Sequence, residues 1–416
     1  MKSQAYLERR YGVDEAVFKL ISIIDKNFTK YSLSEVGLTS KTYFCEIEDE
    51  FGVTSSGIGK GNGEQSKASA LAEALEHYYY ENDNSTRIQR EISIDKFKWF
   101  ESGSPDFSKI INNKKITFDC YTYNNIFDLN EVIEYPCFLS TPNNYDPSSS
   151  SEKRSIESLS LIRYSCNSGT ASGLTQDDAD LHAILELVER DAISIMLLES
   201  VISNNPKPVM KIDFSSAPQD LKFLISSIER ELDGVIEIFD MTSDISVPSI
   251  LVSLTLKIDG ARFFGSGSSI FFEYAIERAI QEALQCANSQ ERLGFYRPIP
   301  KAGIDAIGLP KYTRCFMNKG YFLYRGGESL VHFIDLKEKY IIDKNKYLTS
   351  GLQIKYLSKR LLDTINASIY RRNISQIDED LYVTQVVIPE LERFYLVTAG
   401  LYVSPSRRGY SFLDME

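Results

Sequence analysis

The chain has 416 residues and a mass of 47.3 kDa, enough for one large two-lobed domain or for several domains of roughly 150 residues. Its 43% hydrophobic and 25% charged residues are typical of a globular protein and exclude global disorder. Lys and Arg number 46 against 58 Asp and Glu, so the net charge of −12 disfavours broad nucleic-acid binding, although metal ions could bridge one local site to a polyanion.

No targeting or membrane segment is visible. The N-terminus is charged from its start, and no uninterrupted apolar run reaches the roughly 18 residues of a membrane span. No two cysteines form a C-x-x-C pair and no histidines have metal-ligand spacing, so we expect a cytoplasmic protein with reduced thiols and without a zinc site. These residues are Cys45, Cys120, Cys137, Cys166, Cys286, Cys315, His77, His182 and His332.

The first recognisable unit is a polar, glycine-rich segment at 54–63 that leads into a helix predicted over 65–81. Glycine-rich loops before helices can direct backbone N–H groups and the helix dipole at a phosphate. A flexible turn with a glycine-rich cap explains the same residues equally well. The P-loop spacing G-x-x-x-x-G-K-[ST] is absent.

The remaining elements follow in chain order. An alternating, aromatic strand is predicted at 116–123, and the Pro-, Asn- and Ser-rich segment 140–155 is expected to be a surface loop and an internal boundary. Two further Gly/Ser segments, at 167–173 and 264–269, lead into helices over 177–198 and 272–292. The other expected elements are strands at 235–239, 250–254, 383–388 and 394–398 and a helix at 356–367.

Three of these helices repeat one pattern, A-[LI]-x-E-x-x-[EQ], at 70–76, 183–189 and 279–285. The copies lie about 100 residues apart, which is too far for a solenoid repeat. Each copy follows a Gly/Ser segment. We therefore expect three similar strand–loop–helix units packed around one centre.

Acidic residues of the three helices fall on narrow stripes next to apolar neighbours. The polar positions are Ser69, Glu73 and Glu76 on the first helix, Asp178, Glu186, Glu189 and Arg190 on the second, and Arg278 and Glu282 on the third. Clustered, partly buried acids repel one another unless cations neutralise them. Carboxylates with arginines indicate a nucleotide held through magnesium, and a structural salt-bridge network is the alternative.

These helices and the segments before them resemble the motifs of the YcaO superfamily. The matching segments are 59–78, with Gly59-Lys60-Gly61, then 169–192, which ends in Glu189-Arg190-Asp191-Ala192, and 278–285, which begins with Arg278. They stand in the family's order and span about residues 55 to 295. The resemblance implies an α+β fold of the YcaO type, with acidic helices around a central ATP–magnesium site. It also implies an N-terminal segment at 1–50, an ATP-binding core at 51–300, and a C-terminal part of the same fold at 301–416.

The resemblance also assigns roles by motif position. It implies that Glu73, Glu76, Asp178, Glu186, Glu189 and Glu282 hold magnesium, that Arg190 and Arg278 contact phosphates, that Ser69 lies against the nucleotide, and that Lys60 is a phosphate-side contact. No residue is assigned as catalytic. The chain departs from the family at Asp178, where members usually have Glu, at His77, where many have Arg, and at Leu174, which stands in place of a polar residue. Many azoline-forming members end in a proline-rich tail, whereas residues 403–416 contain only Pro405.

Members of this family use ATP to activate a backbone amide. The resemblance therefore implies a cyclodehydratase that turns Cys, Ser or Thr of a ribosomally made precursor peptide into thiazoline or oxazoline, as in the maturation of bacteriocins and microcins. The expected partners are the precursor peptide, a ubiquitin-activating-like protein that binds its leader, and a flavin dehydrogenase that oxidises azolines; a homodimer is a further expectation. Thioamide or amidine formation, or a non-catalytic scaffold, are the alternatives.

Overall fold

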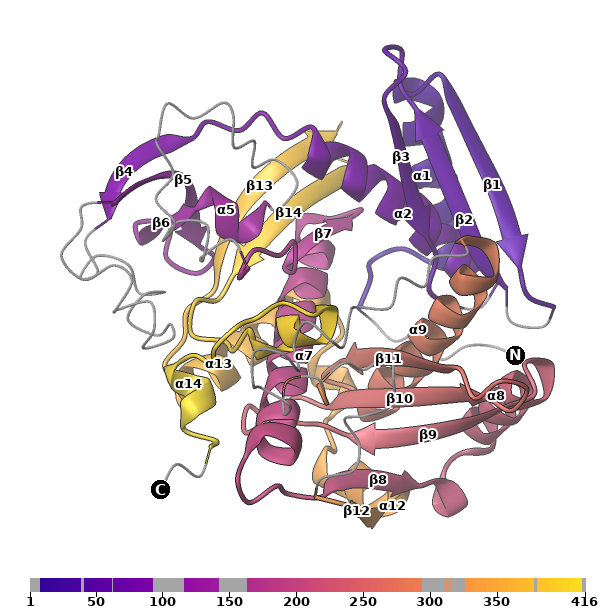
Figure 1. Ribbon diagram of the computed structural model, residues 1–416. Coiled ribbons are helices and arrows are strands. Elements are labelled where there is room, and N and C mark those ends of the chain that lie inside the picture. Colours follow the sequence, from indigo (N-terminus) through magenta and orange to yellow (C-terminus); the bar gives the residue numbers. More distant parts are fainter. Residues whose placement is uncertain are drawn as a thin grey trace.

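The computed structural model describes residues 8–38, 41–61, 63–92, 116–141, 163–293, 312, 314–315, 326–377 and 380–413, and the structural statements below concern these residues. Its strands form three sheets, which surround the long helix α7 in Figure 1. Much of the expected loop at 140–155 lies outside the described residues. None of the described helices has a stretch long and apolar enough to cross a membrane. All six cysteines are free thiols.

The first sheet is a small antiparallel one that helices α1 and α2 cover. Its strands are β1 (Lys30–Val36), β2 (Thr42–Glu48) and β3 (Thr54–Ile58), and the helices are α1 (Val13–Asn27) and α2 (Glu64–Glu81). Ile24, Ile47, Leu71 and Leu75 are fully buried between these elements. This packing fixes the apolar face of α2 and leaves its acidic stripe free to face another part of the molecule.

The second sheet has the strand order β11-β10-β9-β8-β12 and is antiparallel except for the β8–β12 pair. Its strands are β8 (Val209–Asp213), β9 (Gly234–Asp240), β10 (Ser249–Leu256), β11 (Arg262–Ser268) and β12 (Glu328–His332). Three helices pack against it: α8 (Gln219–Glu231), α9 (Phe272–Leu293) and α12 (Phe333–Lys339). Because β10 is covered and paired on both sides, Ile250, Val252 and Leu254 are completely buried.

The third sheet has the order β4-β5-β13-β14-β7, with β6 also paired to β5. Its strands are β4 (Ile88–Ile92), β5 (Ile116–Asn125), β6 (Val132–Pro136), β7 (Thr170–Gly173), β13 (Tyr370–Ile377) and β14 (Leu381–Val387). The short helix α5 (Cys137–Ser140) follows β6, and α13 (Ser350–Ile365) packs against α7. The expected helix at 356–367 thus begins earlier, where Thr349 caps it by accepting a hydrogen bond from the Leu352 N–H.

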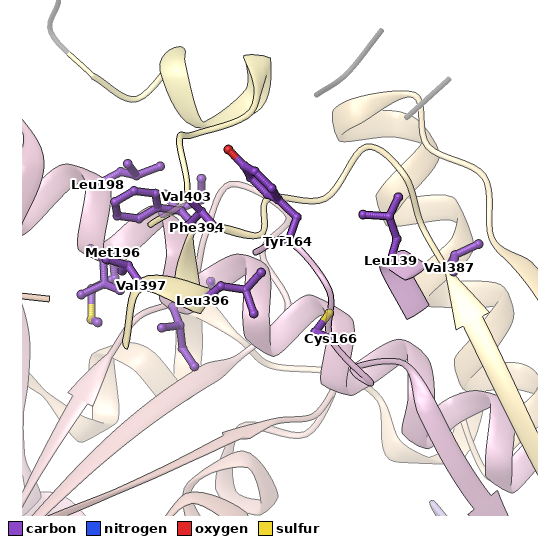
Figure 2. Close-up of a cluster of buried hydrophobic side chains, with 14 of the residues drawn as sticks. Leu139, Tyr164, Cys166, Met196, Leu198, Val387, Phe394, Leu396, Val397 and Val403 are labelled. Carbon is purple, nitrogen blue, oxygen red and sulfur yellow. The ribbon is translucent and has the colours of Figure 1, made fainter. Parts of the chain in front are cut away.

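Helix α7 (Gln176–Leu197) contacts elements of the second and third sheets and α13, so most of its residues are buried. It continues into one π-helical turn at Leu198–Ile202. Around this end of α7, a cluster of buried side chains packs the C-terminal part of the chain onto the helix, as Figure 2 shows for Met196, Leu198 and Phe394. The same cluster includes Leu396, Val397 and Val403, and Phe412 and Leu413 pack against it, so this part of the chain belongs to the core rather than to an appended tail.

Two sequence expectations about local structure were wrong. The segment 394–398, expected as a strand, belongs to the 3-10 helix η7 (Phe394–Ala399). The Glu392 carboxylate accepts hydrogen bonds from the N–H groups of Arg393 and Phe394, at 2.8 and 2.9 Å, and so supplies the acceptor that starts a helical turn. The turn ends at Gly400, whose φ is 81°.

Part of each Gly/Ser segment is likewise strand rather than loop: β3, β7 and β11 take up residues 54–58, 170–173 and 262–268, and each packs against the helix that follows it. The reason is close contact between strand and helix backbones. A Cβ atom at Gly57 would lie 2.4 Å from the carbonyl oxygen of Ala70, and one at Gly265 would lie 2.3 Å from that of Ala279. Only glycine allows this approach, which brings the acidic helices over their strands.

We expect Gly265→Ala to destabilise the fold by about 1–3 kcal/mol or more, because the added methyl meets helix backbone, which cannot rotate away. The nearest atom, the amide nitrogen of Ala283, is 2.2 Å from the Cβ position. Urea denaturation monitored by circular dichroism measures the change. Gly12→Ala is the control, expected to cost less than about 1 kcal/mol, since Gly12 has φ −63° and nothing within 4 Å of its Cβ position. Equal effects of both variants would contradict the close-contact explanation.

Candidate nucleotide and magnesium site

The acidic stripes of α2, α7 and α9 meet at one centre. On α2, Glu73 accepts a hydrogen bond from the Ile58 N–H at 3.2 Å, and Glu76 accepts one from the Ser172 N–H at 2.7 Å. On α7, Glu186 accepts from the Gly169 N–H at 3.2 Å. Each carboxylate is therefore oriented by the glycine-bearing strand at the start of its own or of a neighbouring unit.

Two contacts connect the third helix, α9, and the strand before it, β11, to this centre. The Ser266 hydroxyl on β11 donates to Glu189 at 2.6 Å, which connects α7 to the second sheet. Lys60, which follows β3, binds Glu282 on α9 at 2.9 Å. The structure thus brings together five of the predicted glutamates, from three helices that lie far apart in the sequence.

The glutamates of the different helices act on one another electrostatically. Burial raises the pKa of Glu76 to about 8, and the negative charges of Glu73 and Glu186 add to the shift. Burial also raises the pKa of Glu189, assisted by the charge of Glu282 on the neighbouring helix. A site with this excess of buried negative charge favours a bound cation.

Three basic residues lie among these acids. Burial would raise the pKa of Glu282, but the positive charges of Lys60 and Arg190 outweigh it and lower that pKa. The Arg190 guanidinium is 3.5 Å from both Glu186 and Glu189, while Arg278 is 3.5 Å from Glu8. The Nε of Arg190 is buried and has no hydrogen-bond partner, so this arginine keeps a free donor for an anion.

These residues fit a magnesium–nucleotide complex. Within the described ranges, no three His, Cys, Asp or Glu side chains form a ready-made metal cage. Magnesium does not require one, because it is usually bound by one or two carboxylates together with phosphate oxygens and water. The glutamates supply such carboxylates around the centre, and Arg190 supplies a donor for phosphate oxygens.

Two predicted site residues lie at the edge of this arrangement. Asp178, about 12 Å before Glu186 along the α7 axis, accepts hydrogen bonds from the Ser350 hydroxyl at 2.5 Å and from the Arg10 N–H at 3.2 Å. Ser69 lies one turn before Glu73 on α2 and is half-buried. A pocket beside Asp178, also lined by Tyr11 on the N-terminal segment, holds about 20 Å³, room for about one water. A role for Asp178 in binding magnesium and for Ser69 in binding the nucleotide stays a prediction.

A larger cavity of about 250 Å³ opens beside Arg190. Three groups of described residues line it: the polar Arg190, Glu282 and Ser266, the apolar Ile193, Leu251 and Phe264, and Tyr395, Thr398 and Ala399 from η7. The Arg190 guanidinium lies 5.6 Å from the centre of the Tyr395 ring, a cation–π contact, and the Tyr395 hydroxyl hydrogen-bonds to that of Ser168 at 2.8 Å.

Sequence reasoning missed three residues of this region. Ser266 lies in a Gly/Ser segment that was noticed, but its bond to Glu189 depends on how β11 packs against α7. Glu8, which is buried against Arg278 and accepts a hydrogen bond from Ser269, precedes every recognised motif. Tyr395 lies in the C-terminal part, where the resemblance is loose. No local pattern marks the last two.

The comparisons with known proteins identify the family and the fold. A family model described as YcaO cyclodehydratase, ATP- and Mg²⁺-binding, matches residues 141–392. A solved structure of YcaO from Methanopyrus kandleri bound with AMPPCP and Mg²⁺ is 18% identical, covers 95% of both chains and has a TM-score of 0.65. A heterocyclase in complex with substrate and cofactor is 17% identical, covers 93% of this chain and 54% of its own, and has a TM-score of 0.66.

The heterocyclase TruD is a third similar structure, 15% identical over 79% of this chain and 45% of its own, with a TM-score of 0.53. This chain therefore spans about half the length of both heterocyclases. None of the curated proteins compared matches it. At these identities the solved structures establish the fold, and the family model covers more than half of the sequence. The chain is thus a member of the YcaO cyclodehydratase family, whose members bind ATP and Mg²⁺.

Proposed function

We propose that this protein uses ATP to activate backbone amides of a ribosomally synthesised precursor peptide and closes Cys, Ser or Thr side chains onto them, which gives thiazoline or oxazoline. The observation that carries the proposal is the convergence of Glu73 and Glu76 of α2, Glu186 and Glu189 of α7, and Glu282 of α9 around Arg190. A salt-bridge network built only for stability would balance its charges. Here, burial and neighbouring carboxylates instead raise the pKa of Glu76 to about 8.

In this proposal the bound ATP–magnesium complex supplies the phosphoryl group that accepts the amide oxygen. The glutamates hold the metal, and their backbone hydrogen bonds keep them oriented. Arg190 and Arg278 would hold phosphate oxygens, and Lys60, which pairs with Glu282, would be a phosphate-side contact. Fixed donors of this kind stabilise the charge of a transferring phosphoryl group without reorganisation.

The protein's partners belong to the same proposal. We propose that a separate ubiquitin-activating-like protein binds the leader of the precursor peptide and presents its core to this chain, and that a flavin dehydrogenase oxidises the azolines. Modification of the peptide should therefore be slow with this chain alone and faster when the leader-binding protein is added.

The test is to incubate the protein and ATP–Mg²⁺ with a precursor peptide that contains Cys, Ser and Thr in its core and is labelled with ¹⁸O at the core amides. In cyclisation, the side-chain nucleophile bonds to the amide carbon and the amide oxygen leaves on phosphate. We expect a loss of about 18 Da per ring, one ADP per ring, and label in free phosphate. A gain of about 16 Da with sulfide present would instead identify thioamide formation. Label that stays in the peptide, or AMP as product, would overturn the proposed mechanism.

A further inference from the structure

We infer that the 250 Å³ cavity beside Arg190 binds the peptide segment to be modified. We also infer that the residues of η7, which form one wall of the cavity, select the peptide that can bind there. This inference rests on the proposed function. It adds a location for the peptide and names Tyr395, Thr398 and Ala399, which lie outside every recognised motif, as the residues that position or select it.

The first argument is the order of residues along α7, which places the cavity next to the acidic centre. Glu186 and Glu189 belong to the acidic centre, and Arg190 and Ile193, which follow them, line the cavity. Glu186 and Ile193 lie about 10 Å apart along the helix axis at 1.5 Å per residue. Arg190 and Glu282 belong both to the acidic centre and to the lining of the cavity. A group bound in the cavity would therefore lie next to a nucleotide bound by those two side chains.

The second argument is the lining and the size of the cavity. Ile193, Leu251 and Phe264 offer apolar surface, whereas Ser266 and Arg190 offer polar groups. Apolar walls with a few fixed polar or charged groups are typical of sites that bind an organic ligand. A volume of 250 Å³ is well over ten times the roughly 10–15 Å³ that holds one water molecule, which suits a short stretch of peptide and not a folded partner.

The third step concerns the wall. Ala399 is exposed and Thr398 partly exposed, so the cavity reaches the surface at the end of η7. The rest of the wall is held rigidly against α7: the Tyr395 N–H donates to the Ser194 hydroxyl at 2.8 Å, and that hydroxyl donates to the Arg190 carbonyl at 2.7 Å. A peptide that enters past Ala399 would meet Thr398 and Tyr395 before it reaches Arg190.

The experiment compares Ala399→Trp, which should close the mouth, with Ala399→Ser, a matched variant that leaves it open. Two quantities are measured: the thermal shift caused by AMPPCP with Mg²⁺, and KM and kcat for the precursor peptide described above with its leader-binding protein. We expect Ala399→Trp to raise KM for the peptide at least tenfold or to abolish modification, with a nucleotide-induced shift equal to that of the wild type. Ala399→Ser should match the wild type in both.

Thr398→Val is a second variant that keeps the shape of the wall and removes its hydroxyl, and we expect it to change the relative rates of Cys and Ser cyclisation. Wild-type KM and kcat in Ala399→Trp would show that the peptide enters elsewhere and would overturn this inference alone. A wild-type chain that binds AMPPCP–Mg²⁺ but leaves the peptide unmodified would overturn the proposed function, and this inference with it. A lost nucleotide shift in Ala399→Trp would also contradict the inference, because the cavity would then belong to the nucleotide.

Discussion

Arg190→Ala is expected to lower kcat for peptide-dependent ATP hydrolysis by about 10²–10³-fold, the usual loss when one preorganised donor to a developing charge is removed. The guanidinium lies between the acidic centre and the cavity, 3.5 Å from Glu186 and Glu189, and its Nε is free to donate. Steady-state release of phosphate with saturating peptide measures the effect. Arg190→Lys should recover only part of the rate, because an ammonium group cannot bind two oxygens in parallel.

The control for this variant is Arg230→Ala, which removes an exposed arginine from α8 and should leave kcat unchanged. The nucleotide-induced thermal shift gives a second readout, and we expect it to shrink in Arg190→Ala and to stay constant in Arg230→Ala. Full hydrolysis by Arg190→Ala, in a protein with a wild-type circular dichroism spectrum, would remove Arg190 from the phosphate site.

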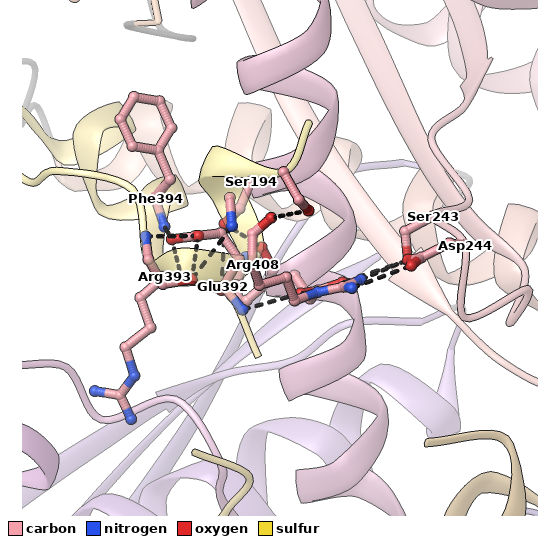
Figure 3. Close-up of polar contacts among 12 residues, drawn as sticks. Ser194, Ser243, Asp244, Glu392, Arg393, Phe394 and Arg408 are labelled. Carbon is pink, nitrogen blue, oxygen red and sulfur yellow. Dashed lines mark hydrogen bonds and ion pairs between the residues drawn. The ribbon is translucent and has the colours of Figure 1, made fainter. Parts of the chain in front are cut away.

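Arg408→Ala is expected to destabilise the protein by about 3 kcal/mol or more, the typical cost of removing one partner of a buried ion pair. In Figure 3, Arg408 of α14 (Arg407–Tyr410) reaches Asp244. Its Nε and NH2 groups also donate to the two oxygens of Asp191 at 2.7 and 2.9 Å, and the side chains of Arg408 and Asp191 are 8% and 0% exposed. Without Arg408, the buried Asp191 carboxylate loses two of its hydrogen-bond donors.

Urea denaturation measures this loss, and Arg407→Ala is the matched control. Arg407 is the preceding residue on the same short helix but is exposed, so its removal should change stability by less than about 0.5 kcal/mol. Arg408→Lys should fall between the two, since a lysine pairs with a carboxylate as a point charge. If Arg407→Ala and Arg408→Ala are equally stable, the ion pair does not hold the C-terminal segment.

This pair matters for the site because Asp191 follows Arg190 on α7. The Glu392 N–H donates to Asp191 at 2.9 Å, and the Glu392 carboxylate accepts from the Ser406 hydroxyl at 2.6 Å. The network therefore links the helix that carries Arg190 to the segment that forms the wall of the cavity. A destabilised Arg408→Ala protein should also show a raised peptide KM, whereas Arg407→Ala should not.

The sequence by itself determined the helices and their chemistry. The spacing of Glu73 and Glu76, and of Glu186 and Glu189, is a property of one helical segment, and a period of 3.6 residues is enough to place each pair on one face. The same local reasoning predicted strands at 235–239 and 250–254, which lie in β9 and β10; β10 is buried as expected, whereas Val235 of β9 is exposed. The resemblance to the YcaO family rests on these segments, and the family model confirms it.

Only the tertiary structure decided which groups share the site. Lys60 and Glu282 are 222 residues apart in the chain, and they form an ion pair because two different sheets hold β3 and α9 side by side. The Gly/Ser segments look like loops locally, yet Gly57 and Gly265 lie in strands and directly under a helix backbone. Periodicity reports how one segment is exposed, whereas Glu8, Tyr395 and the cavity wall depend on packing between segments, which no local pattern encodes.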